Sequence, residues 1–187
     1  MPPKIKITKD DIIRTALEVV RKDGPQALNA RTIASALHCS TQPVFSNFDT
    51  MEELHIAVVT AAETLCMQYI DREVSAALYP PYKASGMAYI RFAKEEKELF
   101  RLLYMRDRTA ETVPEESRLN DRMKSLVHQN TGFQDDIAAL FHLEMWICVH
   151  GIATMFATRY IDLDWDLVSK ILTDFYQGLR KRYGMED

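Results

Sequence analysis

Three short helical patterns in the first quarter of the chain, with only three residues between the second and the third, constrain the fold most. The first pattern begins at Thr8, a good N-cap residue, and ends before Gly24, because glycine adopts the left-handed conformation that closes many helices. The second begins at Asn29, and the third follows with Ser40 or Thr41 as its cap. Two short helices joined by three or four residues predict a helix-turn-helix.

The rest of the chain predicts longer helices, because apolar residues recur at helical spacing and turn residues are few. Only 6 Gly and 7 Pro occur among 187 residues. Helices are expected near these ranges: 49–78, 83–94, 96–105, 115–128, 134–158 and 164–183. The helix at 134–158 is apolar nearly all round, so we expect it to be buried on most sides. The predicted fold is all-α, with a three-helix head at residues 1–50 and a helical domain at residues 51–187.

Composition narrows the classes of protein to which the chain can belong. Apolar residues make up 47% and charged residues 27%, the ordinary balance of a globular protein. The longest uncharged apolar stretch, 145–158, is shorter than the roughly twenty residues that a membrane-spanning helix needs. The start of the sequence lacks the apolar segment that a secretory signal contains. The three cysteines (Cys39, Cys66 and Cys148) are widely spaced, which is typical of reduced core residues. We therefore expect a soluble, cytoplasmic protein with no membrane partner.

Charge is distributed unevenly along the chain. Residues 1–48 contain seven Lys and Arg against four Asp and Glu, a net charge of +3. Because the whole chain has a net charge of −4, the remaining residues, 49–187, have a net charge of −7. A basic end on an acidic body is typical of a segment that contacts a polyanion.

In a helix-turn-helix, the second helix lies in the major groove and its N-terminal residues contact base edges. Gln42 is suited to bidentate contact with adenine, and Thr41 offers a hydroxyl or a methyl group to a base. Arg31 is placed for phosphate or guanine, although an ion pair with Asp23 is an alternative, and Phe45 fits the helix core equally well. The predicted DNA-binding residues are Arg31, Thr32, Ser40, Thr41, Gln42, Pro43, Phe45, Ser46 and Asn47.

Several stretches at the start of the chain occur in a highly specific order and spacing. They are Ala16-Leu17 before Gly24, Leu28 to Ala34, Cys39 to Phe48, and Met51 to Leu54. With them, residues 7–54 resemble the N-terminal DNA-binding domain of the TetR/AcrR family of transcriptional regulators. Further along, the sequence Trp-Ile-Cys-Val-His-Gly at 146–151 resembles the Trp…His-Gly signature of one family of TetR-type C-terminal domains.

The resemblance implies a homodimer that binds a palindromic operator in double-stranded DNA. Residues 134–158 and 164–183 of each subunit would form a four-helix bundle between the subunits. It also implies a small-molecule effector that binds the C-terminal core and releases the DNA, which is how a repressor acts; activation is the alternative. The candidate effector-binding residues, each of which fits a plain core equally, are Tyr89, Phe92, Phe100, Tyr104, Met123, Met145, Trp146 and His150.

The chain departs from the family pattern at positions that contact phosphate. Phe45 stands where the family usually has Tyr, Asn47 where it often has His, and Met51 where Lys is common. His38 occupies a turn position where Gly is common. Three lysines of the N-terminal arm are candidates for replacing the missing phosphate contacts: Lys4, Lys6 and Lys9.

Motifs for catalysis are not evident in the sequence. There is no Gly-rich phosphate loop and no His-Glu-x-x-His, and the pair His38-Cys39 lacks companion ligands at zinc spacing. His142 and His150 have no obvious nucleophile or base beside them. We therefore expect no enzyme, no metal site and no cofactor. The alternative function, from another class, is a helical regulator whose N-terminal head binds a protein partner rather than DNA.

Overall fold

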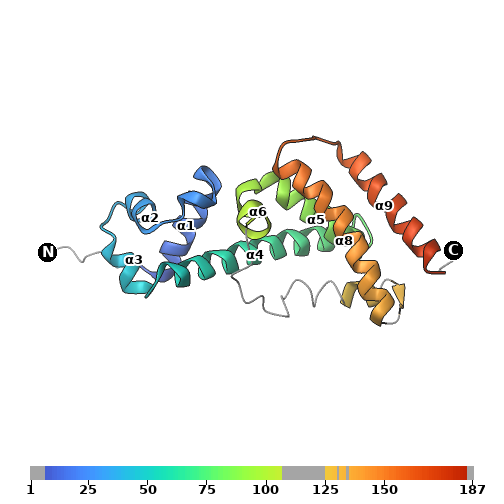
Figure 1. The fold of residues 1–187 in the computed structure, drawn as a ribbon, viewed down its shortest axis with the longest axis horizontal. Coiled ribbons are helices and arrows are strands. Elements are labelled where there is room, and N and C mark those ends of the chain that lie inside the picture. Colours follow the sequence, from blue (N-terminus) through green and yellow to red (C-terminus); the bar gives the residue numbers. More distant parts are fainter. Residues whose placement is uncertain (1–6, 107–124, 130, 134, 185–187) are drawn as a thin grey trace. The chain divides into compact units, whose positions relative to one another are not determined.

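The computed structural model describes residues 7–106, 125–129, 131–133 and 135–184, and within these ranges the chain is helical with no strand. The helices, in order, are α1 (Lys9–Asp23), the short 3-10 helix η1 (Pro25–Ala27), α2 (Ala30–Ala36), α3 (Gln42–Asn47), α4 (Met51–Ala76), α5 (Pro81–Glu95), α6 (Lys97–Tyr104), α8 (Asp135–Ala157) and α9 (Trp165–Arg182) (Figure 1). Residues 125–129 are also helical, while the rest of the helix expected at 115–128 lies outside the described residues. The predicted all-α fold is confirmed.

The chain divides into two compact units. The first unit contains Met1–Leu65 and Glu96–Arg106, and the second contains Cys66–Glu95 and Asp107–Asp187. Helix α6 joins the first unit although it lies far along the chain, because it packs on α1. The division by function at residue 50 stays a prediction.

Helix α1 begins and ends as the local sequence predicts. The Thr8 side chain accepts the Asp11 N–H at 3.1 Å, and the Asp11 carboxylate accepts the Thr8 N–H at 3.1 Å, which completes a capping box. At the other end Gly24 has φ +84°, and a Cβ built there would lie 2.6 Å from the Gln26 side chain. Both ends are thus set by local chemistry, and the positive φ at position 24 requires glycine, whereas the flexible end of the Gln26 side chain can move away from a Cβ.

Helix α2 has a side-chain cap at its start and a strained cap at its end. The Asn29 side chain accepts the N–H groups of Arg31 and Thr32 at 3.1 and 3.0 Å. At the C-terminus the His38 N–H bonds the Ser35 carbonyl, and the Cys39 N–H bonds the Ala34 carbonyl. This is a Schellman motif, in which the residue after the C-cap is left-handed, and here it is His38 with φ +53°.

The core of the first unit holds α1, α2, α3 and the start of α4 together. Its fully buried side chains come from every one of these helices and from α6: Ile12, Val20, Ile33, Val44, Phe48, Leu54, Leu99 and Phe100. An ion pair reinforces the packing of α6 on α1, because the Arg21 guanidinium donates to both Glu96 oxygens at 2.8 and 2.9 Å. The same guanidinium also pairs with Glu18.

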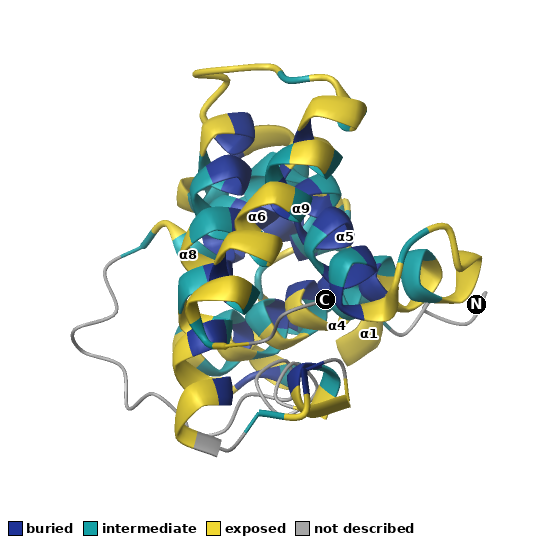
Figure 2. Cartoon of the chain, turned by 90° about the vertical axis from the view of Figure 1, so that its right-hand side faces the viewer, coloured by how far each residue is buried: buried dark blue, intermediate teal, exposed yellow. Residues whose placement is uncertain are grey.

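In the second unit α5 packs closely along α8, and α9 packs on both. Gly86 of α5 permits this approach, since a Cβ there would lie 3.3 Å from the Val149 Cγ2 of α8. The expectation that α8 is buried on most sides is wrong for a single chain. Only a third of the residues in the most apolar part of α8 are buried, and Ile147 is 58% exposed (Figure 2). One side of α8 covers α5, and the described chain leaves the opposite side uncovered.

Replacing His38 by Gly should stabilise the first unit, because a left-handed conformation costs an L-residue with a Cβ more than it costs glycine. We expect His38→Gly to raise the free energy of unfolding by about 0.5–1 kcal/mol after glycine's backbone entropy is subtracted. Denaturant-induced unfolding measures the difference. Ser35→Gly, at an exposed helical position of α2, is the control and should lower stability by about 0.5 kcal/mol. Destabilisation by both variants would contradict the assignment of strain to His38.

Candidate functional sites: the α3 surface and the cavity of the second unit

Helix α3 presents a polar face to solvent and an apolar face to the core. Val44 and Phe48 are buried, whereas Gln42, Phe45 and Ser46 are exposed. These three positions are spaced by three and four residues, so they share one side of the helix. Phe45 is 51% exposed, which removes the interpretation of this ring as a core residue.

Of the remaining polar side chains of the α3 segment, Ser46 and Asn47 donate to backbone carbonyls, whereas Ser40 and Thr41 lie before the first turn. Thr41 stands at the N-cap position but makes no side-chain capping bond, and Ser40 before it is exposed. The Ser46 hydroxyl donates to the Gln42 carbonyl at 2.9 Å. The half-buried Asn47 amide donates to the Pro43 carbonyl of its own helix at 2.8 Å and to the Ile7 carbonyl at 3.5 Å.

The N-terminus of α2 adds a cation in the same unit. Arg31 is exposed and makes no ion pair with Asp23 or any other acid in the described part of the chain. Thr32 beside it is half-buried, and its N–H is used by the Asn29 cap. The arrangement leaves the Arg31 guanidinium accessible to a phosphate or a base.

Lys9, in contrast, is engaged inside the first unit. Its Nζ lies 2.7 Å from Glu53 Oε1 and 4.6 Å from the centre of the Phe48 ring. The hydrogen bond from Lys9, together with the Asp49 N–H, lowers the pKa of the Glu53 carboxyl below its ordinary value. A phosphate contact by Lys9 therefore has to displace an existing ion pair. Lys4 and Lys6 lie outside the described residues.

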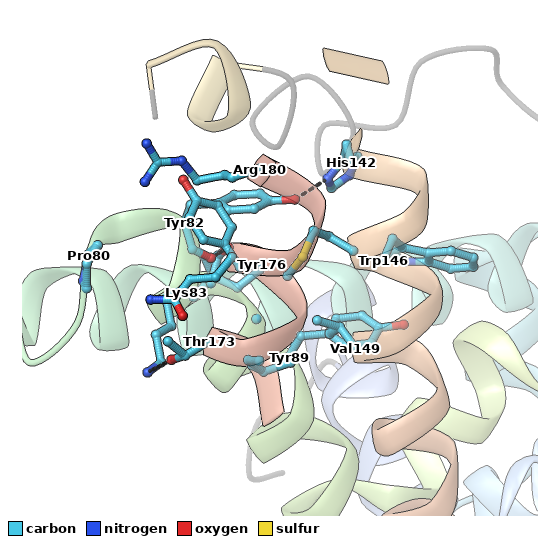
Figure 3. A pocket seen from close by; sticks show the side chains of 16 residues that line it. Pro80, Tyr82, Lys83, Tyr89, His142, Trp146, Val149, Thr173, Tyr176 and Arg180 are labelled. Atoms are coloured by element: carbon cyan, nitrogen blue, oxygen red, sulfur yellow. Dashed lines mark hydrogen bonds between the residues drawn. The ribbon is translucent and has the colours of Figure 1, made fainter. Parts of the chain in front are cut away.

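The second unit contains a cavity of about 520 Å³. Helices α5, α8 and α9 form most of its wall, and α4 contributes Ile70 (Figure 3). Its lining residues are Ile70, Pro80, Tyr82, Lys83, Ser85, Gly86, Tyr89, His142, Met145, Trp146, Val149, Leu172, Thr173, Tyr176, Gln177 and Arg180. The volume falls within the range of roughly 300–1,000 Å³ that is usual for small-molecule sites.

Two tyrosine–histidine pairs connect α5 to α8. The Tyr82 hydroxyl lies 3.0 Å from His142 Nδ1, and the Tyr89 hydroxyl lies 2.9 Å from His150 Nδ1. Both hydrogen bonds join groups that are at least partly buried, and burial lowers the pKa of each histidine below its ordinary value. The pairs anchor the cavity wall with neutral imidazoles.

The structure brings three of the predicted effector-binding residues to this cavity: Tyr89, Met145 and Trp146. His150 is not in the lining. It contacts two lining residues instead, through its hydrogen bond to Tyr89 and by stacking on the Trp146 ring with 4.7 Å between ring centres.

The other predicted effector-binding residues do not line the cavity. Phe92 is fully buried and meets the Tyr69 ring edge-on, with 5.5 Å between centres. Phe100 and Tyr104 belong to the first unit, where their rings lie 5.0 Å apart. Met123 lies outside the described residues. Helical spacing alone does not distinguish these aromatic residues from residues that line a cavity.

Comparison with known proteins identifies the fold. Residues 82–174 match the family described as tetracyclin repressor-like, C-terminal domain. The chain also resembles the crystal structure of a TetR-like transcriptional regulator from Rhodococcus sp. RHA1, with a TM-score of 0.69 and 15% sequence identity over 99% of this chain and 100% of the other. No curated protein sequence gives a significant match. This protein belongs to the TetR family of regulators.

Sequence reasoning missed the contribution of α9 to the cavity of this TetR-family protein. Leu172, Thr173 and Tyr176 line the cavity, and so does Arg180. A signal was present in the sequence, because positions 172, 173, 176 and 180 share one helical side that mixes apolar with polar residues. Such a mixture is unusual on the buried side of a helix.

Acidic and metal-ligating groups are sparse around the cavity of the regulator. Within the described ranges, no group of three or more His, Cys, Asp or Glu is placed to hold a metal ion. Glu144 of α8 accepts from Arg182 at 2.9 Å and from the Tyr183 hydroxyl at 2.8 Å, and it does not line the cavity.

Acidification should destabilise this TetR-family protein, because burial depresses the pKa of His142 in the folded state. Around pH 6 the unfolded chain binds more protons than the folded chain, so stability falls as the pH drops through about 6.5. Denaturant midpoints at about pH 7.5 and about pH 5.5 measure the effect. His142→Gln should reduce this pH dependence, while His38→Gln, at an exposed turn, should not. An unchanged pH dependence in His142→Gln would contradict the prediction.

Proposed function

We propose that this TetR-family regulator is a DNA-binding repressor. In this proposal a homodimer binds a palindromic operator in double-stranded DNA, and a small-molecule effector releases it. Residues 1–50 act as the DNA-binding part, and residues 51–187 bind the effector and dimerise. We assign no catalytic step and no cofactor to the chain. The proposed cytoplasmic location is supported by Cys39 and Cys148, which form no disulfide.

The exposed face of α3 carries the proposal for DNA binding. Gln42 is exposed in the first turn of α3, and the N-cap residue before it, Thr41, makes no side-chain capping bond. This position suits contact of Gln42 with a base edge in the major groove. Arg31 supplies an exposed cation in the same unit. Asn47 stays among the proposed DNA contacts, and a contact through its amide N–H competes with the existing bond to the Pro43 carbonyl.

One observation favours the alternative, a head that binds a protein partner. Phe45 exposes half of an apolar ring on the same face as Gln42, and Lys9 is already paired with Glu53. Fewer available cations and an exposed aromatic ring are typical of a protein-binding surface. The two functions differ in their response to salt, because DNA binding weakens steeply as counterions compete for phosphate.

Selection of bound duplexes from a random DNA library tests the DNA-binding function. The wild-type protein should enrich a palindromic consensus, since a two-fold symmetric dimer reads two matching half-sites. Gln42→Ala should bind that consensus about 5- to 100-fold more weakly, the effect of losing one bidentate base contact worth about 1–3 kcal/mol.

Gln68→Ala is the matched control, since Gln68 is exposed on α4 in the second unit. It should leave the affinity for the consensus unchanged. Affinity for the consensus should also fall as the salt concentration rises. A folded protein that enriches no duplex would reject the DNA-binding function and favour the protein-binding head.

The uncovered side of α8 supports the homodimer. Its exposed apolar residues are Ile137, Leu140, Leu143, Ile147 and Met155. Leu140, Leu143 and Ile147 lie on the side of the helix opposite its buried face, and the other two flank that side. Helix α9 adds two exposed apolar residues, Leu167 and Phe175. Exposed apolar side chains in this number are costly in water, which supports a proposed interface on this surface. Gly151 and Gly178 lie on these sides with open space around them, so a partner helix has room for close approach.

Ile147→Glu should convert the dimer to monomer, because it places a charge in the centre of the proposed apolar interface. Sedimentation equilibrium measures the molar mass, and we expect the dimer affinity to fall at least about 100-fold. Ile56→Glu is a closely matched control, since Ile56 is 57% exposed on α4 against 58% for Ile147. A dimer that survives Ile147→Glu as well as Ile56→Glu would place the interface elsewhere.

Release of DNA by an effector requires only that the effector binds the DNA-free state more tightly than the DNA-bound state. The ratio of the two affinities sets the size of the shift. The cavity of the second unit is the proposed effector site, on the grounds of its volume and its mixture of aromatic and polar walls.

A further inference from the structure

The charged residues that line the cavity are all basic. Lys83 of α5 and Arg180 of α9 belong to the lining, and none of its described residues is Asp or Glu. Figure 3 places both cations on the side of the cavity where Tyr82 and Tyr176 lie, while Trp146 lies on the α8 side. The cavity therefore has a cationic end and an apolar, aromatic end.

Lys83 lacks a carboxylate partner in the described part of the chain. Its Nζ donates to the Thr173 hydroxyl at 2.8 Å and lies 4.9 Å from the centre of the Tyr79 ring. The side chain is partly buried, and burial lowers the pKa of its ammonium group. A desolvated ammonium bonded only to neutral groups gains free energy from an anion that enters beside it.

Arg180 extends the same positive potential across α9. Its guanidinium carbon lies 5.8 Å from the centre of the Tyr176 ring, which holds the side chain along the cavity wall. Thr173 and Gln177 stand on the same side of α9 and supply further hydrogen-bonding groups. One cation from α5, one cation from α9 and two neutral polar groups of α9 match a ligand with a single anionic group.

The rest of the wall is suited to an apolar body. Ile70, Met145, Val149 and Leu172 contribute aliphatic and thioether surface, and Trp146 contributes an aromatic ring. We propose that the cavity binds an amphipathic anion, a molecule with an aromatic or aliphatic body and one carboxylate or sulfonate group, which Lys83 and Arg180 hold. This inference deepens the effector-binding part of the proposed function and rests on it for its regulatory role.

A matched pair of fluorescent probes tests the inference on the full chain without DNA. Anilinonaphthalene sulfonate and phenylnaphthylamine share the same aromatic body, and only the first has an anionic group. Lys83→Met keeps the length and apolar character of the side chain and removes its charge. It should weaken binding of the sulfonate about tenfold or more while changing binding of the neutral probe less than about twofold.

Three further variants test the roles of the two cations. Lys83→Arg should retain sulfonate binding within about threefold, because it keeps a cation at the site. Lys170→Met removes an exposed lysine of α9 that does not line the cavity, and it should leave both probes unaffected. Arg180→Gln should weaken the sulfonate selectively, as Lys83→Met does.

Three results would overturn the inference: equal binding of the sulfonate by wild type and Lys83→Met, equal loss of both probes in Lys83→Met, or no binding of either probe to wild type. The readout is independent of the proposed function. If duplex selection fails while charge-dependent probe binding persists, DNA binding is rejected and the ligand class stands. If duplex selection succeeds and charge dependence is absent, only the ligand class is rejected.

Discussion

The packing of α5 along α8 is the interaction on which the second unit depends. Gly86 lets the two helices approach closely, and the Tyr82–His142 and Tyr89–His150 pairs tie them together. A helix that buries one side against a neighbour presents its opposite side outward. Because α8 is apolar on both sides, this single packing event creates a buried core and an exposed apolar surface at once. The cavity follows, since α9 completes a wall that α5 and α8 begin.

The first unit shows how internal bonds select the side chains that remain available for recognition. Lys9 pairs with Glu53, Arg21 pairs with Glu96, and the Asn47 amide bonds the backbone of α3. Each of these polar groups gains a partner during folding, so a second partner must compete with the first. Residues 1–48 consequently offer less unpaired positive charge to a polyanion than the count of Lys and Arg in the sequence suggests. Gln42 and Arg31 keep their side chains directed to solvent.

The elements that the sequence predicted best are those controlled by neighbours within four residues. The caps at Thr8 and Asn29, the positive φ at Gly24 and the start of α3 after Thr41 all agree with the sequence analysis. The cavity agrees less well. Tyr89, Met145 and Trp146 line it, whereas Phe92 and Phe100 are ordinary core residues, since aromatic residues at helical spacing serve both purposes.

The amino-acid sequence by itself determined the helical class, the ends of the short helices and the residue types available on each helical side. These depend on capping hydrogen bonds, backbone preferences and periodicity, which act over a few residues. Only the tertiary structure decided that α6 joins α1, that Lys83 and Arg180 line one cavity, and that one side of α8 remains uncovered. These outcomes depend on which surfaces meet across long separations in the chain, where burial is non-directional and does not specify its partner locally.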